Sequence, residues 1–127
     1  MKLLLDTHIL IWISLDMLPR AAEKYILDEF NQLYFSPANI WEIVIKRGIG
    51  RADFNVDPHM LYSALLENGY EELSITSRHV LSIGTMPKLH KDPFDRILLA
   101  QSVIEQIPLL TSDVKMAKYP APVILVK

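Results

Sequence analysis

Two aspartates follow short apolar segments that have the composition of buried strands. Asp6 comes directly after the run 2–5, and Asp113 follows the run 108–111. In parallel α/β sheets, sites form outside the carboxyl ends of the strands, so two acids placed there are candidates for one shared site. Each aspartate could instead cap the helix that follows its strand, and the sequence alone leaves both interpretations open.

Two further acids lie in segments with helical spacing. Asp95 falls in the first turn of an apolar helix predicted to begin at Pro93, with Asp92 as its N-cap. This position resembles a capping box and suits the helix dipole, which would give Asp95 a purely structural role. Glu42 lies within an apolar helical run, and Lys46 four residues later could form an ordinary ion pair with it.

The four acids together favour a metal site over four independent structural roles. Carboxylates that are brought together repel one another and raise each other's pKa, unless a cation relieves the repulsion. The donors would all be oxygen atoms, since the chain has no cysteine and its four histidines show no ligand-like spacing. Such a set selects Mg²⁺ or Mn²⁺. These ions suit phosphodiester hydrolysis, because they can activate a water molecule and stabilise the leaving oxygen.

Strands that alternate with helices would position these acids. Aromatic residues at helical spacing are expected in the core, namely Trp12, Tyr25, Phe30 and Trp41. Strands are predicted at 2–5, 33–35, 73–75, 108–111 and 123–126, and helices at 8–15, 19–31, 37–47, 58–68, 77–84 and 93–107. The alternation predicts an α/β fold with a mostly parallel central sheet flanked by helices.

The composition is that of one globular domain, expected to span residues 1–127. Half of the residues are hydrophobic and 22% are charged, which argues against disorder. The net charge is −2, so any contact with nucleic acid must come from a local basic patch or from metal ions. The longest uncharged apolar stretch, 9–15, is shorter than the roughly 18 residues that a membrane span needs. The absence of cysteine fits a reducing compartment, and we expect a cytoplasmic protein.

Four blocks of sequence, in one order along the chain, carry a family resemblance. They are Leu4–His8 with Trp12, Ser36 with Trp41–Ile43 and Ile45–Lys46, Leu89–Arg96 with Leu99–Gln101, and Leu110–Asp113. With these blocks the sequence resembles the PIN-domain ribonucleases of the VapC toxin type, from type II toxin–antitoxin systems. The most specific block is Asp-Pro-Phe-Asp-Arg at 92–96. The resemblance implies a single three-layer PIN-like domain.

The family's four acidic positions fall on Asp6, Glu42, Asp95 and Asp113. The resemblance implies that these acids hold one or two Mg²⁺ or Mn²⁺ ions and that the protein cleaves RNA, leaving 5′-phosphate and 3′-hydroxyl ends. Asp6, Asp95 and Asp113 would be direct ligands, and Glu42 would bind directly or through water. The resemblance also implies a cognate antitoxin protein as partner and a homodimer.

Further residues near these acids are candidates for supporting roles. Thr7 and Thr111 lie beside two of the acids, where hydroxyl groups could orient ligand carboxylates. Three basic residues are candidates for contacts with RNA phosphates, although a solvated surface explains them as well. They are Arg96, Lys46 and Lys91. The histidines are interpreted as surface or core polar residues, and His90, within the third block, could contact substrate or position a loop.

Other functions remain open on the sequence alone. A housekeeping RNA-processing nuclease would use the same acids, although the short chain and the block at 92–96 favour the toxin. Phosphotransfer is less well supported, because haloacid-dehalogenase-like phosphatases need a second aspartate where this chain has His8, and no glycine-rich phosphate loop is present. A non-catalytic binding module would use the acids only as caps and surface ion pairs. Divalent ions would then leave its stability unchanged, whereas they would stabilise a nuclease.

Overall fold

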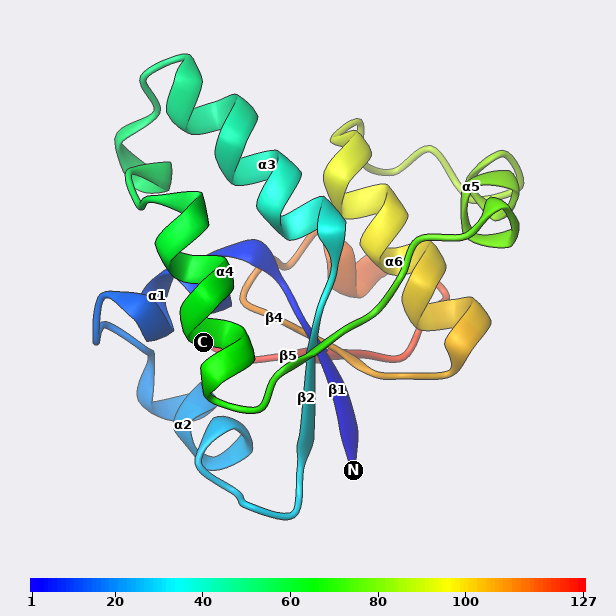
Figure 1. Ribbon diagram of the computed structural model, residues 1–127. Coiled ribbons are helices and arrows are strands. Elements are labelled where there is room, and N and C mark those ends of the chain that lie inside the picture. Colours follow the sequence, from blue (N-terminus) through cyan, green and yellow to red (C-terminus); the bar gives the residue numbers. More distant parts are fainter.

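The fold is built on a five-stranded sheet in which all strands are parallel. The computed structural model describes residues 1–127, and its strands lie side by side in the order β3-β2-β1-β4-β5 (Figure 1). The strands are β1 (Lys2–Leu5), β2 (Gln32–Phe35), β3 (Glu71–Glu72), β4 (Leu109–Thr111) and β5 (Val123–Leu125). The predicted α/β fold with a parallel central sheet is confirmed.

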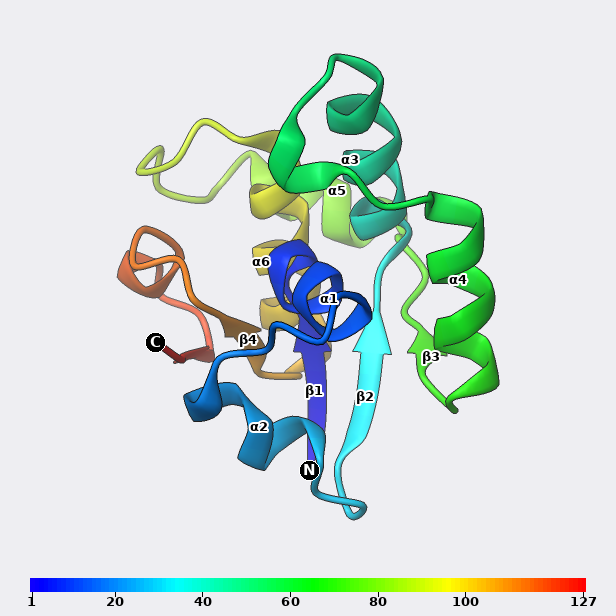
Figure 2. The ribbon, with the colours of Figure 1, turned by 90° about the vertical axis from the view of Figure 1, so that its left-hand side faces the viewer.

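Helices cover both faces of the sheet and produce three layers. The α-helices are α1 (Thr7–Ser14), α2 (Arg20–Ile26), α3 (Pro37–Gly48), α4 (Pro58–Glu67), α5 (Ser77–Ile83) and α6 (Pro93–Glu105), and the 3₁₀ turns are η1 (Ala52–Phe54) and η2 (Met116–Lys118). Figure 2 shows α1 and α2 on one side of β1 and β2, with α6 on the other side. Side chains alternate across a strand, so Leu3 and Leu5 pack with the first group of helices and Leu4 packs with α6. No helix is both long and apolar enough to span a membrane.

The register of the sheet determines which chain segments meet at its carboxyl edge. Leu5 of β1 pairs with Leu110 of β4, so the next residues along each strand, Asp6 and Thr111, are neighbours. On its other side β1 pairs with β2, whose end leads into α3. The segments that carry the predicted acids are therefore brought to one edge by backbone pairing of the central strands.

Polar caps start three of the helices at this same edge. The Asp6 side chain accepts from the first N–H of α1, and Ser36 forms a capping box with Asn39 at the start of α3. Asp92 caps α6, and proline occupies the first position of both α3 and α6. Such caps satisfy N–H groups that a helix leaves unpaired, so they set where each helix begins and how it meets the sheet.

The predicted bounds of the third strand were wrong. The sequence predicts a strand at 73–75, whereas β3 is Glu71–Glu72. Leu73 still donates its backbone N–H to the Phe35 carbonyl oxygen, 2.7 Å away, and the regular pairing stops there. Leu73 and Ile75 instead pack against the apolar cluster beside α6, which explains why this segment has the composition of a strand.

Helix α2 is shorter than the helix predicted at 19–31. It ends at Ile26, and Asp28 then fixes a turn by accepting hydrogen bonds from two backbone N–H groups. Its side chain binds Phe30 at 2.9 Å, and its carbonyl oxygen binds Asn31 at 3.0 Å. This turn leaves Phe30 93% exposed, so the prediction that Phe30 belongs to the core was wrong.

The other aromatic predictions had mixed outcomes. Trp12 and Tyr25 are partly buried against the apolar cluster beneath α1 and α2, as expected. Trp41 is 57% exposed, so its assignment to the core was wrong. One edge of Trp41 rests on Phe94 of α6, with ring centroids 4.9 Å apart, and this contact links α3 to α6 near the candidate site.

A matched pair of phenylalanine variants tests this division of core and surface. Phe35 is fully buried in β2, and we expect Phe35→Ala to lower the free energy of unfolding by about 3–5 kcal/mol. Phe30→Ala removes the same side chain from an exposed turn, so its effect should stay within about 0.5 kcal/mol. Urea unfolding of both variants measures the two changes. Comparable losses would contradict the assigned burial.

Candidate metal centre

Asp6 lies at the carboxyl end of β1 and is 5% exposed. Its Oδ1 accepts a hydrogen bond from the Thr7 backbone N–H at 2.8 Å, and its Oδ2 accepts one from the Thr111 hydroxyl at 2.6 Å. The neighbouring strand β4 therefore orients this carboxylate. Each carboxylate oxygen has two lone pairs, so both keep acceptor capacity for a cation.

The two threonines occupy different positions relative to Asp6. Thr111 contacts the carboxylate through its hydroxyl group, as a residue that orients a ligand would. The Thr7 hydroxyl instead accepts from the Asn39 side-chain amide at 2.9 Å, and the same amide donates to the Leu5 carbonyl at 3.2 Å. Asn39, which the sequence analysis missed, thus ties α3 to the end of β1. Its place three residues after the cap Ser36 was the available signal.

Glu42 extends from α3 toward the start of α6, where Lys46 lies between it and Asp92. The Lys46 Nζ donates to Glu42 Oε2 at 2.6 Å and to Asp92 Oδ2 at 2.9 Å. Burial would lower the pKa of Lys46, but the hydrogen bonds to these two carboxylates outweigh it and raise that pKa. Burial likewise tends to raise the pKa of Asp92, and the bond from Lys46 reverses this, so its pKa is lowered. Both shifts favour the charged forms of Lys46 and Asp92.

Asp95 lies in the first turn of α6 beside His90 and Asp113. The His90 Nε2 is 2.6 Å from Asp95 Oδ2 and 3.6 Å from Asp113 Oδ2, yet it makes no hydrogen bond of good geometry. Asp113 is anchored at the end of β4, where its backbone N–H donates to the Thr111 hydroxyl at 3.0 Å. Its side chain is 34% exposed, so this end of the cluster opens to solvent.

The pKa of Asp95 is raised to about 9. Burial is the largest cause, and the nearby carboxylates add to it. They are Asp6, Asp92, Glu42 and Asp113. Burial also raises the pKa of Asp6, although the hydrogen bonds from Thr111 and Thr7 act in the opposite direction. The site as a whole thus disfavours additional negative charge and would gain stability from a bound cation.

The donor atoms fit a divalent metal ion. Two groups of three side chains each place their donor atoms within 4.8 Å of one another, and the groups share Asp95. The groups are His90–Asp95–Asp113 and Glu42–Asp92–Asp95. The Oε1 atom of Glu42 is buried without a hydrogen-bond partner, which is costly unless a ligand meets it. Carboxylate oxygens dominate the set, as Mg²⁺ and Mn²⁺ require.

His90 adds a nitrogen atom to the gathered oxygen donors. The sequence predicts donors that are all oxygen and gives His90 no ligand spacing, whereas the structure places its Nε2 among the carboxylates. The backbone of His90 explains the placement, because its N–H donates to the Tyr119 hydroxyl at 2.7 Å. Its position in the third block of the resemblance would not have revealed this contact, which joins residues 29 positions apart.

The three basic residues predicted to contact RNA are in different environments. The Arg96 guanidinium donates to the Ile83 carbonyl at 3.0 Å, with its Nε buried, so it holds α6 against the end of α5. Lys46 is ion-paired inside the site, as described above. Lys91 is exposed in the loop before α6. Only Lys91 therefore has the free position expected of a phosphate contact, and the RNA contacts stay predictions.

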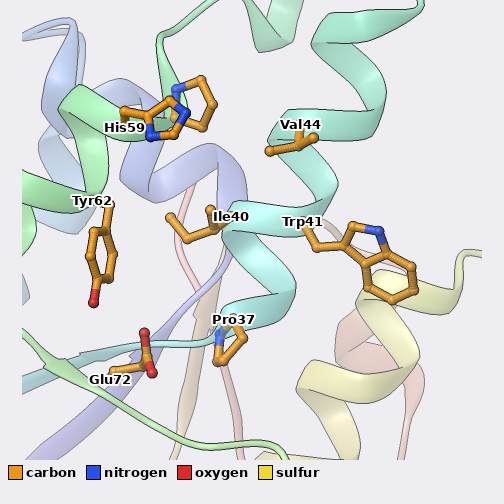
Figure 3. A pocket seen from close by; sticks show the side chains of 8 residues that line it. Pro37, Ile40, Trp41, Val44, His59, Tyr62 and Glu72 are labelled. Carbon is orange, nitrogen blue, oxygen red and sulfur yellow. The ribbon is translucent and has the colours of Figure 1, made fainter.

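An apolar groove between α3 and α4 lies apart from the acids (Figure 3). Ile40 and Val44 of α3 face Tyr62 of α4 across it. Its volume is about 390 Å³. The lining residues are Pro37, Ile40, Trp41, Val44, Pro58, His59, Tyr62 and Glu72. Since none of these is an acid of the candidate centre, the groove is a separate surface feature.

The family model described as PIN domain matches residues 3–122. A search of curated proteins finds no match. Among solved structures, a chain of VapBC2 from Rickettsia felis bound to a promoter DNA fragment is similar over the full length of both chains, with 14% identity and a TM-score of 0.75. A chain of DNA-bound VapBC from Salmonella typhimurium is 14% identical, with 98% of this chain and 97% of that chain covered and a TM-score of 0.66. A chain of VapBC-1 from nontypeable Haemophilus influenzae is 20% identical, with 93% of this chain and 91% of that chain covered and a TM-score of 0.65. At these identities the likeness shows a shared fold.

The raised pKa of Asp95 predicts that the metal-free protein loses stability as the pH rises. In the unfolded chain Asp95 ionises near its ordinary value of 3.8, and in the folded protein near 9. Between these pH values the folded state keeps a proton on Asp95 that the unfolded chain has lost. The contribution of this protonated carboxyl group to folding stability is therefore complete at low pH and is lost as the pH approaches 9. We expect the melting temperature in EDTA to fall over this range. The limiting slope is about 1.4 kcal/mol per pH unit.

Two variants separate Asp95 from the other titrating groups in this experiment. Asp95→Asn has no proton to lose, so its melting temperature should depend less steeply on pH than that of the wild type. Asp16→Asn changes an exposed aspartate in a turn, where φ is 55° and asparagine is well tolerated, and it should keep the wild-type slope. Equal slopes for all three proteins would contradict the assignment to Asp95.

Proposed function

Because the chain belongs to the PIN domain family, we propose that it is a divalent-metal-dependent endoribonuclease that hydrolyses RNA phosphodiester bonds, and that it is the toxin of a toxin–antitoxin pair. One observation carries the proposal. Carboxylates from four distant parts of the chain gather at the carboxyl edge of the sheet, where burial and the neighbouring charges raise the pKa of Asp95 to about 9.

In this proposal each acid has a distinct task. Asp6, Asp95 and Asp113 hold a Mg²⁺ or Mn²⁺ ion, and Glu42 binds directly or through water. Such an ion supplies an activated water molecule and positive charge for the leaving oxygen. Thr111 keeps the Asp6 carboxylate oriented through its hydroxyl hydrogen bond, since a ligand that can rotate binds metal less tightly.

RNA would approach from the side where the site opens to solvent. Asp113 is the most exposed of the four acids, and His90 stands beside it at the end of the loop that precedes α6. Lys91 is exposed in the same loop, where its ammonium group could contact a phosphate. With a net charge of −2 the protein has no general attraction for RNA, so local contacts of this kind must supply it.

The toxin role is supported by the shared fold. The similar structures are VapBC complexes, and they match this chain over nearly its whole length. We therefore propose a cognate antitoxin protein as partner, a homodimer as the working form, and the cytoplasm as the location. A housekeeping nuclease of the same family would share the metal centre and differ in having no antitoxin.

Cleavage of total cellular RNA tests the proposed activity. We expect discrete fragments in Mn²⁺ or Mg²⁺ and none in EDTA. Asp6→Asn should lower the rate by more than about 100-fold, since groups that only orient metal ligands already contribute about 10–100-fold. Labelled RNA resolved on a denaturing gel gives the rates.

Asp16→Asn is the matched control and should cleave like the wild type. Cleavage that survives in EDTA, or in Asp6→Asn, would contradict the proposal. If no preparation cleaves RNA, melting with Mn²⁺ decides between a nuclease of narrow specificity and a binding module, because only a protein that binds the ion is stabilised by it.

The exposed position of Lys91 yields a separate prediction. Lys91→Ala should weaken the binding of the metal-free protein to RNA of any sequence, and should reduce the slope of log K against log salt by about 0.7. Filter binding over a range of salt concentrations measures that slope. Glu29 is exposed and far along the chain, so Glu29→Ala serves as the control. An unchanged slope for Lys91→Ala would remove Lys91 from the RNA contact.

A further inference from the structure

The acidic edge of the sheet consists of two halves that share Asp95. On the solvent side Asp95 lies with His90 and Asp113, and on the α3 side it lies with Glu42 and Asp92. Each half has three donor atoms within 4.8 Å of one another, which is the arrangement expected of two neighbouring cation positions. The halves differ in one respect, which is the location of Lys46.

The α3 half already contains a positive charge. The Lys46 Nζ is 2.6 Å from a Glu42 oxygen and 2.9 Å from an Asp92 oxygen, so it bridges two of the three carboxylates of that half. The Lys46 side chain is 16% exposed. Its Nζ also lies 4.8 Å and 5.7 Å from the ring centres of Phe54 and Phe94, within range of a cation–π interaction with each.

The solvent-side half has no comparable cation. No lysine or arginine side chain pairs with Asp95 or Asp113, whose ion-pair contacts are both with His90. Asp113 is also the most exposed of the four acids, so this half adjoins solvent. A hydrated divalent ion requires oxygen donors and access to water, which favours this half.

We propose that the Lys46 ammonium group takes the place of a second metal ion, so that the centre binds a single divalent ion on the side of Asp95 that faces His90 and Asp113. This inference rests on the proposed metal-dependent function and adds the number and position of the ions. Lys46 acts as a positioning residue, because it neutralises Glu42 and Asp92 and excludes a second divalent ion from their half of the centre.

The contacts of Lys46 hold its ammonium group in one position, unlike those of an ordinary exposed ion pair. A surface pair between residues four positions apart on a helix is weak and exposed. Here the lysine of α3 also reaches Asp92, the residue that caps α6 through two backbone N–H groups. Lys46 therefore links the two helices that supply Glu42 and Asp95, and its charge is held between the Glu42 and Asp92 carboxylates of the α3 half.

Binding of Mn²⁺ to the full-length protein tests this proposal. We expect isothermal titration to give one ion per chain for the wild type, and the electron paramagnetic resonance spectrum to be that of an isolated ion. Lys46→Ala removes the ammonium group and frees the Glu42–Asp92–Asp95 half, so this variant should bind two ions per chain and show a spin-coupled pair. Lys46→Arg keeps the charge and should bind one.

Each outcome has a defined meaning. Two ions in the wild type, or one ion in Lys46→Ala with a wild-type spectrum, would overturn the role of Lys46 while leaving metal dependence intact. No Mn²⁺ bound by the wild type would overturn the proposed function itself. If Lys46→Ala does not fold, Lys46→Gln removes the charge with less loss of packing and should likewise bind two ions. The combined variant Lys46→Ala with Asp92→Asn should return to one ion, because the second position then lacks a carboxylate.

Discussion

The burial of carboxylates beside one another at the end of a parallel sheet is the constraint on which the rest of the site depends. Burial and neighbouring charges raise the pKa of Asp95 to about 9, and burial also raises the pKa of Asp6. The fold offsets part of this cost with fixed donors: the Thr111 hydroxyl orients Asp6, and the Lys46 ammonium lies between the carboxylates of α3 and α6. What remains uncompensated lies on the solvent side, where an ion can enter. The proposed chemistry therefore depends on a local electrostatic imbalance that a bound cation would remove.

The strand order of the sheet and the starts of its helices bring the segments that carry these acids together. β1 is central and pairs with β4, so the residues that follow the two strands become neighbours. α3 leaves the end of β2 under a capping box, and α6 begins at a cap that also holds Lys46. Asp6 and Asp113 thus follow strand ends and Asp95 lies in a capped first turn, whereas Glu42 lies in the second turn of α3. A site on such elements keeps its geometry without a ligand, as a site that must bind metal and substrate in turn requires.

Much of this was predictable from the sequence, because strand ends and helix caps have local signals. The fold class follows from short-range patterns of composition and spacing, whereas the grouping of Asp95 with the other acids was expected from the strand ends together with the family resemblance. His90 was not predictable, since a hydrogen bond to Tyr119, 29 residues away, sets its place. Arg96 directly follows Asp95, but successive residues on a helix point about 100° apart, so it faces α5 and not the acids. Phe30 was misassigned because α2 ends at Ile26, so the helical spacing does not extend to Phe30, and the turn held by Asp28 leaves this side chain exposed.

If the gathered carboxylates form a metal centre, a divalent ion must bind among them. Anomalous diffraction from a crystal soaked in Mn²⁺ tests this binding, since it locates the ion without any assumption about activity. We expect an anomalous peak at the carboxyl edge of the sheet, in coordination contact with Asp95 and Asp113 and close to Asp6. A soaked crystal with no peak at this edge, or with Mn²⁺ bound only elsewhere on the surface, would contradict it.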